Sequence, residues 1–195
     1  EGCKVCVAFC PEEAIRFPEK HCGQWYISST RFGPLVHAQL FPGEENSGRL
    51  VMVLKQKARE LAKDCGVDMV LCDGAPGIGC PVISSLSGAG LAVAVTEPTP
   101  SGRHDLERVA DLCKHFQLPF AVIINKHDLN PDETTRIESY CHDRNYPVLA
   151  RLPHDVIVTK AMVQGLVVTE LSDGWFSQEL RQAWTRIEEL VGAGQ

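Results

Sequence analysis

Three cysteines lie within the first ten residues of the 195-residue chain, at a spacing that suits a metal cluster. Cys3, Cys6, Cys10 and Pro11 form the pattern C-x2-C-x3-C-P. Thiolates at this spacing can wrap one compact iron–sulfur cluster, and the proline turns the chain away from it. Zinc is the competing metal, but its sites usually need a second pair of ligands, and no C-x2-C or H-x3-H pair follows. The pattern therefore favours iron and sulfide over zinc.

The ligand set is incomplete within this sequence. The pattern is the second half of the ferredoxin run C-x2-C-x2-C-x3-C-P, whose first cysteine would lie one residue before Glu1. In ferredoxins with two clusters the last cysteine of the run, here Cys10, serves the other cluster. We therefore expect Cys3, Cys6 and Cys10 to be ligands of [4Fe–4S] clusters that this chain cannot complete by itself.

A second site is indicated where an apolar run ends in an acidic residue. Residues 67–72 read VDMVLC, and residues 73–77 read DGAPG. A buried strand would deliver the Asp73 carboxylate to the carboxyl edge of a sheet, where it can hold Mg²⁺ through water. The glycines would let backbone amides turn toward a γ-phosphate. The alternative is an aspartate that caps a helix after an ordinary strand.

A third signal follows the apolar run at residues 120–124. Asn125 and Lys126 come directly after it, and Asp128 follows two residues later. An asparagine and a lysine at the end of a buried strand can read the edge of a purine and pack along its ring. The spacing N-K-x-D is also the pattern of GTPases, in which the aspartate accepts hydrogen bonds from guanine. An ordinary strand-to-helix turn is the third possibility, and the choice between ATP and GTP stays open.

The scaffold that would position these residues is an alternation of short strands and longer helices. Four apolar runs are typical of buried parallel strands: residues 67–72, 91–95, 120–124 and 148–152. Helices are predicted from the N-cap candidate Ser47 to Gly66, and over residues 103–116, 132–143, 155–164 and 178–191. Residues 21–46 show no regular pattern. We therefore expect an α/β domain with a parallel sheet.

The net charge and the lengths of the apolar runs indicate which kinds of partner are expected. The net charge is −6, so the phosphate backbone of nucleic acid is not an expected partner, and proteins are favoured. No apolar run approaches the ~20 residues that a membrane span needs, and the start of the chain does not resemble a secretory signal. We expect a cytoplasmic protein.

The remaining cysteines and one serine are interpreted as structural. Cysteines without ligand spacing are expected to be buried free thiols, namely Cys65, Cys72, Cys80, Cys113 and Cys141. Ser101 is the N-cap candidate of the helix that follows it.

Taken in order, the motifs make the chain from about Cys3 to Leu171 resemble the MinD/ParA superfamily of P-loop ATPases, in the branch with an inserted ferredoxin domain. The resemblance rests on the cysteine run, TRFGPLVHA at 30–38, GEENSG at 43–48, DGAPG at 73–77, TEPTPSG at 96–102, NK at 125–126 and LPHD at 152–155. It implies the end of a ferredoxin-like insert at 1–20, a connecting segment at 21–46, and a Rossmann-like three-layer nucleotide-binding domain at 47–195.

The resemblance also implies roles for single residues. Asp73 would position Mg²⁺ and the hydrolytic water, and Gly77 would contact the γ-phosphate. Asn125, with Lys126, would recognise adenine, and the loop at Pro153 would close over the base. Members of the superfamily bind ATP with Mg²⁺ and form dimers, so a homodimer is expected.

One part of the superfamily pattern is absent. No glycine-rich loop ending in Gly-Lys-Thr or Gly-Lys-Ser occurs in the 195 residues, so nothing here can cradle the β- and γ-phosphates. The loop is expected upstream of Glu1, in which case the chain is truncated at its N-terminus and inactive as an ATPase by itself.

Two functions from different classes follow. The first is an ATP-binding, ATP-hydrolysing switch coupled to [4Fe–4S] clusters, acting in electron transfer or metal-cluster handling with a redox or cluster-accepting protein. The alternative is a non-catalytic iron–sulfur or protein-binding scaffold.

Overall fold

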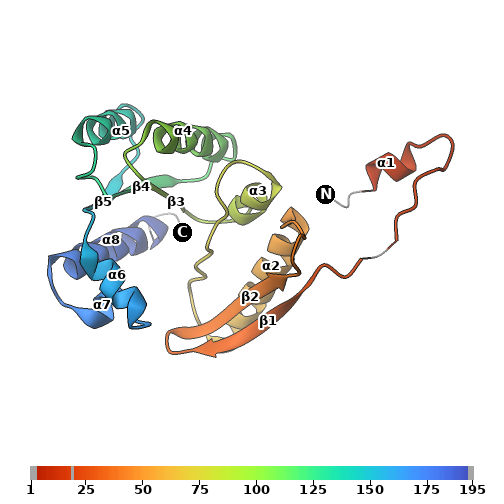
Figure 1. Cartoon of the computed structure of the whole chain (residues 1–195), viewed down its shortest axis with the longest axis horizontal. Coiled ribbons are helices and arrows are strands. Elements are labelled where there is room, and N and C mark those ends of the chain that lie inside the picture. Colours follow the sequence, from red (N-terminus) through yellow and green to blue (C-terminus); the bar gives the residue numbers. More distant parts are fainter. Residues whose placement is uncertain (1–3, 19, 193–195) are drawn as a thin grey trace. The chain divides into compact units, whose positions relative to one another are not determined.

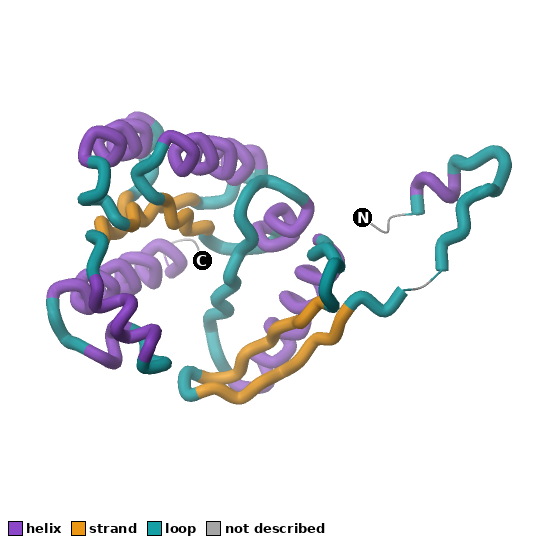
Figure 2. The backbone as a smooth tube through the Cα atoms, in the orientation of Figure 1, coloured by secondary structure: helices purple, strands orange, loops and turns teal. Residues whose placement is uncertain are grey.

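The computed structural model describes residues 4–18 and 20–192. The chain divides into two compact units, residues 1–87 and residues 88–195. The first holds an antiparallel hairpin with its helices, and the second holds a parallel sheet (Figure 1 and Figure 2). Among the helices in the described ranges, none is long and apolar enough to span a membrane.

The first unit contains α1 (Val5–Ala8), β1 (Gly23–Thr30), β2 (Gly33–Leu40), α2 (Gly48–Cys65) and α3 (Cys80–Leu86). Every residue of β1 has a partner in β2, so the prediction of an irregular segment over 21–46 is wrong there. The glycine and proline that suggested irregularity lie at the turn, where Gly33 has a φ of +121° that favours glycine. Apolar residues share one face of the hairpin, as in the pair Trp25 and Ala38.

Helix α2 begins and ends where the sequence predicts. The Ser47 side chain accepts a hydrogen bond from the Leu50 amide at 3.3 Å, as an N-cap does. Gly66 follows the helix with a φ of 64°, and its amide bonds back to the last turn. The helix packs against β2 and α3.

A lysine buried between α2 and α3 holds the two helices together. The Lys55 Nζ donates to the carbonyls of Ser84 at 3.2 Å and Ser87 at 2.8 Å, and also to that of Ser85. These carbonyls lie at the C-terminal end of α3, where helix backbone acceptors lack partners of their own. Burial lowers the pKa of Lys55, and the nearby Arg59 lowers it further. The ammonium therefore replaces its water shell with backbone oxygens.

We predict that Lys55→Met lowers the free energy of unfolding by about 1–3 kcal/mol, because buried carbonyls at the end of α3 lose their donor. Denaturant unfolding of the chain measures this. Lys57→Met is the matched control, since the Lys57 ammonium is exposed and its ion pair with Glu60, at 2.7 Å, is exposed as well. This substitution should change stability by less than about 0.5 kcal/mol. Equal effects of the two substitutions would contradict the capping role.

The predicted strand at 67–72 is wrong. These residues have no regular secondary structure, and Leu71 is 79% exposed. A parallel strand exists through its hydrogen-bonded neighbours, and no described residue pairs with this run. Cys72 is accordingly exposed, which corrects the expectation of a buried thiol.

The second unit contains three parallel strands, β3 (Ala92–Thr96), β4 (Phe120–Asn125) and β5 (Val148–Leu152), in the order β3-β4-β5. Its helices are α4 (Pro100–His115), α5 (Pro131–Asp143), α6 (Val156–Val163), α7 (Val168–Leu171) and α8 (Trp175–Gly192). Helices α4 and α5 cover one face of the sheet, and α8 covers the other (Figure 1). The predicted strands and helices of this unit are confirmed, with boundaries that move by a few residues.

Most of the structure's buried side chains lie in this unit. Ala121, Leu149, Ala150 and Leu152 of the sheet pack with Phe176 and Ala183 of α8, and Val122, Ile124 and Ile137 are fully buried. One extra residue, Leu149, interrupts the ladder between β4 and β5. Its carbonyl accepts a hydrogen bond from Arg186 of α8 at 2.6 Å, so the interruption leaves that acceptor satisfied.

Two smaller predictions are settled here. Cys113 and Cys141 are buried, as expected, and burial raises the pKa of each thiol to about 11. Cys65 and Cys80 are exposed, so that expectation is wrong for them. The N-cap of α4 is Thr99, whose side chain accepts from the Gly102 amide at 2.9 Å, and not Ser101, because Pro100 fits the first helical position.

Candidate functional site

Three loops of the second unit follow the carboxyl ends of its parallel strands. β3 ends at Thr96, β4 at Asn125 and β5 at Leu152, and parallel pairing brings these ends to one edge of the sheet. Crevices at this edge are the usual place for ligands in open α/β sheets. Asn125 is the last residue of β4 and Pro153 is the first after β5; both are partly buried. The structure therefore places Asn125, Lys126 and Pro153 at the same edge of the sheet, and their roles toward a nucleotide stay predictions.

Hydrogen bonds join the loops after β4 and β5. The His127 amide donates to the Leu152 carbonyl at 3.0 Å, and the His154 amide donates to Asp128 Oδ1 at 2.6 Å. The Thr134 hydroxyl of α5 donates to the His127 carbonyl at 2.8 Å. The hydrogen bond from the His154 amide holds the pKa of Asp128 below its usual range. Asp128 is thus ionised and fixes the segment that contains Pro153.

An ion pair joins the loops after β3 and β4. The Lys126 Nζ lies 2.7 Å from Glu97 Oε1, with the lysine side chain 36% exposed and the glutamate side chain 46% exposed. A pair as exposed as this adds little stability, so its effect is on position. Lys126 also has a φ of 55°, a left-handed backbone that turns the chain sharply after β4. The lysine predicted to lie along a purine ring is here directed to Glu97.

The start of α4 lies close under the β3 loop. A Cβ on Gly102 would come within 2.5 Å of the Glu97 carbonyl oxygen, so only glycine fits there. The Thr96 hydroxyl donates to the Gly102 carbonyl at 3.1 Å. This contact fixes the backbone that carries Glu97.

Asp73 and Gly77 belong to the first unit. Asp73 is exposed, and no strand leads to it, which corrects the expectation that a strand delivers its carboxylate to a sheet edge. Gly77 is partly buried with a φ of +86°, a conformation that favours glycine. Their roles toward Mg²⁺ and phosphate stay predictions.

The cysteine run is described only in part. Cys3 lies outside the described residues; Cys6 is exposed on α1, and Cys10 is partly buried just after it. Within residues 4–18 and 20–192, no group of three or more His, Cys, Asp or Glu side chains could hold a metal ion. Free thiols suit iron–sulfur chemistry, but Cys6 and Cys10 would each supply one ligand to a different cluster, and each cluster takes four.

Sequence reasoning missed Glu97 and His154. Both act through contacts between distant residues: Glu97 with Lys126, and His154 with Asp128, 26 residues away. The available signal was positional, because each residue lies within two positions of a strand end. A search of all strand ends for charged side chains would have found Glu97, whereas a backbone donor such as the His154 amide leaves no mark in the sequence.

Two curated relatives come from Methanocaldococcus jannaschii, and both are uncharacterized proteins. MJ0578 is 26% identical over 160 residues, which cover 81% of this chain and 52% of that protein. MJ0579 is 26% identical over 155 residues, which cover 74% and 55%. The chain therefore spans about half the length of the curated relatives it matches. No family model matches it.

Comparison with solved structures shows which fold the chain has. MinD from Pyrococcus horikoshii, complexed with Mg-ADP, is similar with a TM-score of 0.59 at 17% identity, over 76% of this chain and 60% of that one. A ParA family ATPase from Chlorobium tepidum gives a TM-score of 0.54 at 19% identity, over 74% and 62%. The chain has the MinD/ParA fold. This confirms the predicted α/β class with a parallel sheet, whereas the ferredoxin remnant at 1–20 and the domain boundaries at 20 and 46 stay predictions.

The edge of the sheet where β3, β4 and β5 end is called the strand-end edge below. Its hydrogen bonds yield a prediction about Asp128. Asp128→Ala should reduce the hydrogen-exchange protection of the His154 amide, because its acceptor is lost. The Ile157 amide, which donates to Asp155 at 2.8 Å, is the internal control and should stay protected. NMR-detected exchange measures both.

Acid should reproduce the effect of the substitution. Because the pKa of folded Asp128 is depressed, its stabilising contribution is present above the pKa of the unfolded state and is lost as the pH falls through the folded value. The difference between wild type and Asp128→Ala should therefore shrink in acid. Equal protection of His154 in the two proteins at neutral pH would contradict this role.

Proposed function

We propose that this chain is the nucleotide-binding part of a Mg²⁺-ATP-dependent switch protein with the MinD/ParA fold. The observation that carries the proposal is the strand-end edge, where Asn125, Lys126 and Pro153 come together on loops held by Asp128 and Glu97. Asn125 offers one amide donor and one acceptor, which match the amino group and ring nitrogen of adenine. Pro153 supplies an apolar surface for the base.

The bonding of Asp128 supports ATP over GTP. Guanine presents two adjacent donors, N1–H and the N2 amino group, which a carboxylate recognises best with both oxygens. Asp128 Oδ1 already accepts from the His154 amide at 2.6 Å. One carboxylate oxygen is therefore already engaged with the protein, which makes two-oxygen recognition of guanine less favourable although the spacing N-K-x-D matches that of GTPases.

The phosphate end of the proposed site rests on the sequence. We propose that Asp73 orients Mg²⁺ and the hydrolytic water and that the Gly77 amide contacts the γ-phosphate. Bound Mg²⁺ would neutralise charge on the phosphates. The 195 residues contain no Gly-Lys-Thr or Gly-Lys-Ser loop, and the matched relatives are about twice as long as the aligned part. The proposal therefore assigns the phosphate cradle to another part of the full-length protein.

Competition of ATP and GTP against a fluorescent ATP analogue on the full-length protein tests this proposal. ATP should compete at least about tenfold better than GTP, and Asn125→Ala should weaken ATP by up to about tenfold, the effect of one or two hydrogen bonds. Gln182→Ala, an exposed amide on α8, should have no effect. Asp73→Asn should keep ATP binding but lose Mg²⁺-dependent hydrolysis.

Equal competition by GTP would support the hypothesis that Asp128 accepts hydrogen bonds from guanine, as in GTPases. The absence of any nucleotide binding by the full-length protein would favour the alternative function, a non-catalytic scaffold that binds clusters or proteins.

The cysteine run supports a second function, the binding of [4Fe–4S] clusters coupled to the nucleotide switch. Its support is the spacing C-x2-C-x3-C-P together with the accessibility of Cys6. Cys3, Cys6 and Cys10 would each supply a thiolate, and the remaining ligands would come from outside these residues. By resemblance, we further propose a cytoplasmic homodimer with a redox or cluster-accepting protein as partner.

Anaerobic reconstitution of the full-length protein with iron and sulfide tests the cluster. We predict that Cys6→Ser lowers the iron and sulfide content and alters the visible absorbance and the EPR signal of the reduced protein. Cys65→Ser is the matched control, because Cys65 is also an exposed free thiol but has no ligand spacing. Equal cluster content in the two variants would refute the assignment, and binding of zinc in place of iron would support the competing metal.

A further inference from the structure

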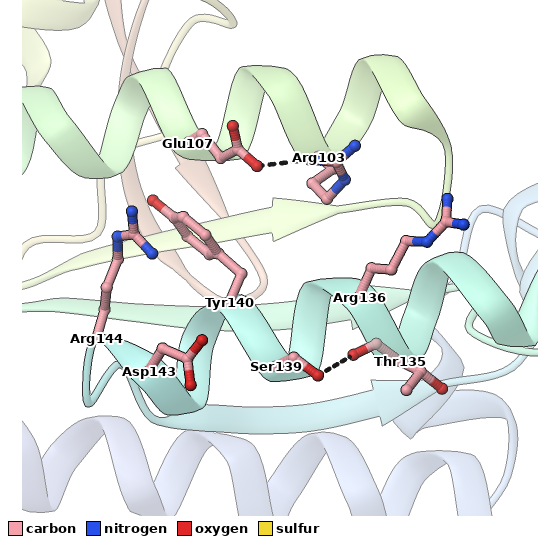
Figure 3. Close-up of a pocket in the computed structure, with 8 residues that line it drawn as sticks. All are labelled: Arg103, Glu107, Thr135, Arg136, Ser139, Tyr140, Asp143 and Arg144. Atoms are coloured by element: carbon pink, nitrogen blue, oxygen red, sulfur yellow. Dashed lines mark hydrogen bonds and ion pairs between the residues drawn. The ribbon is translucent and has the colours of Figure 1, made fainter.

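A groove of about 470 Å³ runs between α4 and α5 on one face of the second unit's sheet (Figure 3). Its lining is polar and charged, and consists of Arg103, Glu107, Thr135, Arg136, Ser139, Tyr140, Asp143 and Arg144. The groove lies between helices and not at the strand ends, so it is distinct from the proposed nucleotide site. Nothing in the proposed function uses it.

The phenol of Tyr140 is the first unexplained group in the groove. Its hydroxyl oxygen is buried and has no hydrogen-bond partner among the described residues. Burial raises the pKa of Tyr140 to about 12, so the hydroxyl keeps its proton and is a donor at neutral pH. Buried donors in folded proteins are almost always paired, so this hydroxyl has room for an acceptor from outside the described residues, either a ligand or a water.

Arg144 is the second unexplained group. Its guanidinium carbon lies 4.1 Å from the centre of the Tyr140 ring, and the two side chains extend side by side from the end of α5 toward α4 (Figure 3). Arg144 forms no ion pair with any carboxylate in the described part of the chain. Its five donors therefore face the groove or water, beside the Tyr140 hydroxyl.

Two of the acidic groups near the groove, Glu133 and Glu107, pair with arginines. Asp111, whose charge helps to raise the pKa of Tyr140, has no ion pair among the described residues. Glu133, 2% exposed, lies 2.6 Å from Arg103 and 2.9 Å from Arg136, and Arg103 also pairs with Glu107 at 2.8 Å. Arg103 lowers the pKa of Glu133, which is therefore ionised and fully used. Among the lining carboxylates, Asp143 has only a histidine, His142, at 3.6 Å. Arg136 keeps a side chain that is 66% exposed.

We propose that this groove binds an oxyanion, a carboxylate or phosphate group, which accepts from the Tyr140 hydroxyl and pairs with Arg144. A guanidinium beside a neutral donor is a common arrangement for such groups. Arg136, on the same face of α5 and two turns before Arg144, would contact a second charged group of a larger ligand. The negative charge of Asp143 would repel an anionic ligand and so lower its affinity.

Titration calorimetry of the nucleotide-free, full-length protein tests the site, with pyrophosphate and citrate as separate probes and EDTA in place of Mg²⁺. Tyr140→Phe removes only an unpaired hydroxyl, so the protein should fold as before. Tyr140→Phe and Arg144→Gln should each weaken binding by about tenfold. Asp143→Asn should tighten it by about threefold, a gain that a folding defect cannot imitate.

Arg108→Gln is the matched control, because Arg108 is an exposed arginine of α4 outside the groove, 3.7 Å from Asp105. It should leave both probes unaffected. Tighter binding of pyrophosphate identifies a phosphate ligand, and tighter binding of citrate a carboxylate ligand. The proposal is overturned if neither probe binds saturably, or if binding survives Tyr140→Phe and Arg144→Gln unchanged. In both cases the Tyr140 hydroxyl is bonded to water alone.

Discussion

The strand-end edge of the second unit depends on the register between β4 and β5. Val122 pairs with Val148, but Asn125 pairs with Leu152, because Leu149 is an extra residue in β5. Without it, Asn125 would lie opposite Arg151. The shift brings Leu152 level with the end of β4, where its carbonyl accepts from the His127 amide. A bulge of one residue thus sets the positions of two loops.

The bulge persists because its unpaired carbonyl has a partner in another layer. Arg186 of α8 donates to the Leu149 carbonyl, while the Leu149 side chain is buried against the same helix. The helix on one face of the sheet therefore helps to determine the geometry of the edge. Lys55 acts similarly in the first unit, where one buried cation satisfies several backbone carbonyls of a neighbouring helix. Both cases follow from the cost of an unpaired buried acceptor.

Local signals predicted most of the second unit and α2, because caps and apolar runs act over a few residues. Ser47 and Gly66 fix the ends of α2 through bonds within one turn. The run at 67–72 is mostly apolar, like the confirmed strands, but a strand also needs a partner, and composition does not supply one. The hairpin was missed for the opposite reason, since its Gly-Pro turn dominated the pattern. The Asp128 contact to the His154 backbone could not be predicted, because any residue can provide that amide.

Burial also divides five of the cysteines, those without ligand spacing, into two chemical classes. Cys113 and Cys141 lie in the core of the second unit, and their raised pKa values leave almost no thiolate at neutral pH. Cys65, Cys72 and Cys80 of the first unit are exposed. Alkylating reagents should therefore modify the first unit and spare the second while it stays folded. Modification of Cys113 or Cys141 would then report the opening of the parallel sheet's core, and the labelling of Cys72 would report the surroundings of Asp73.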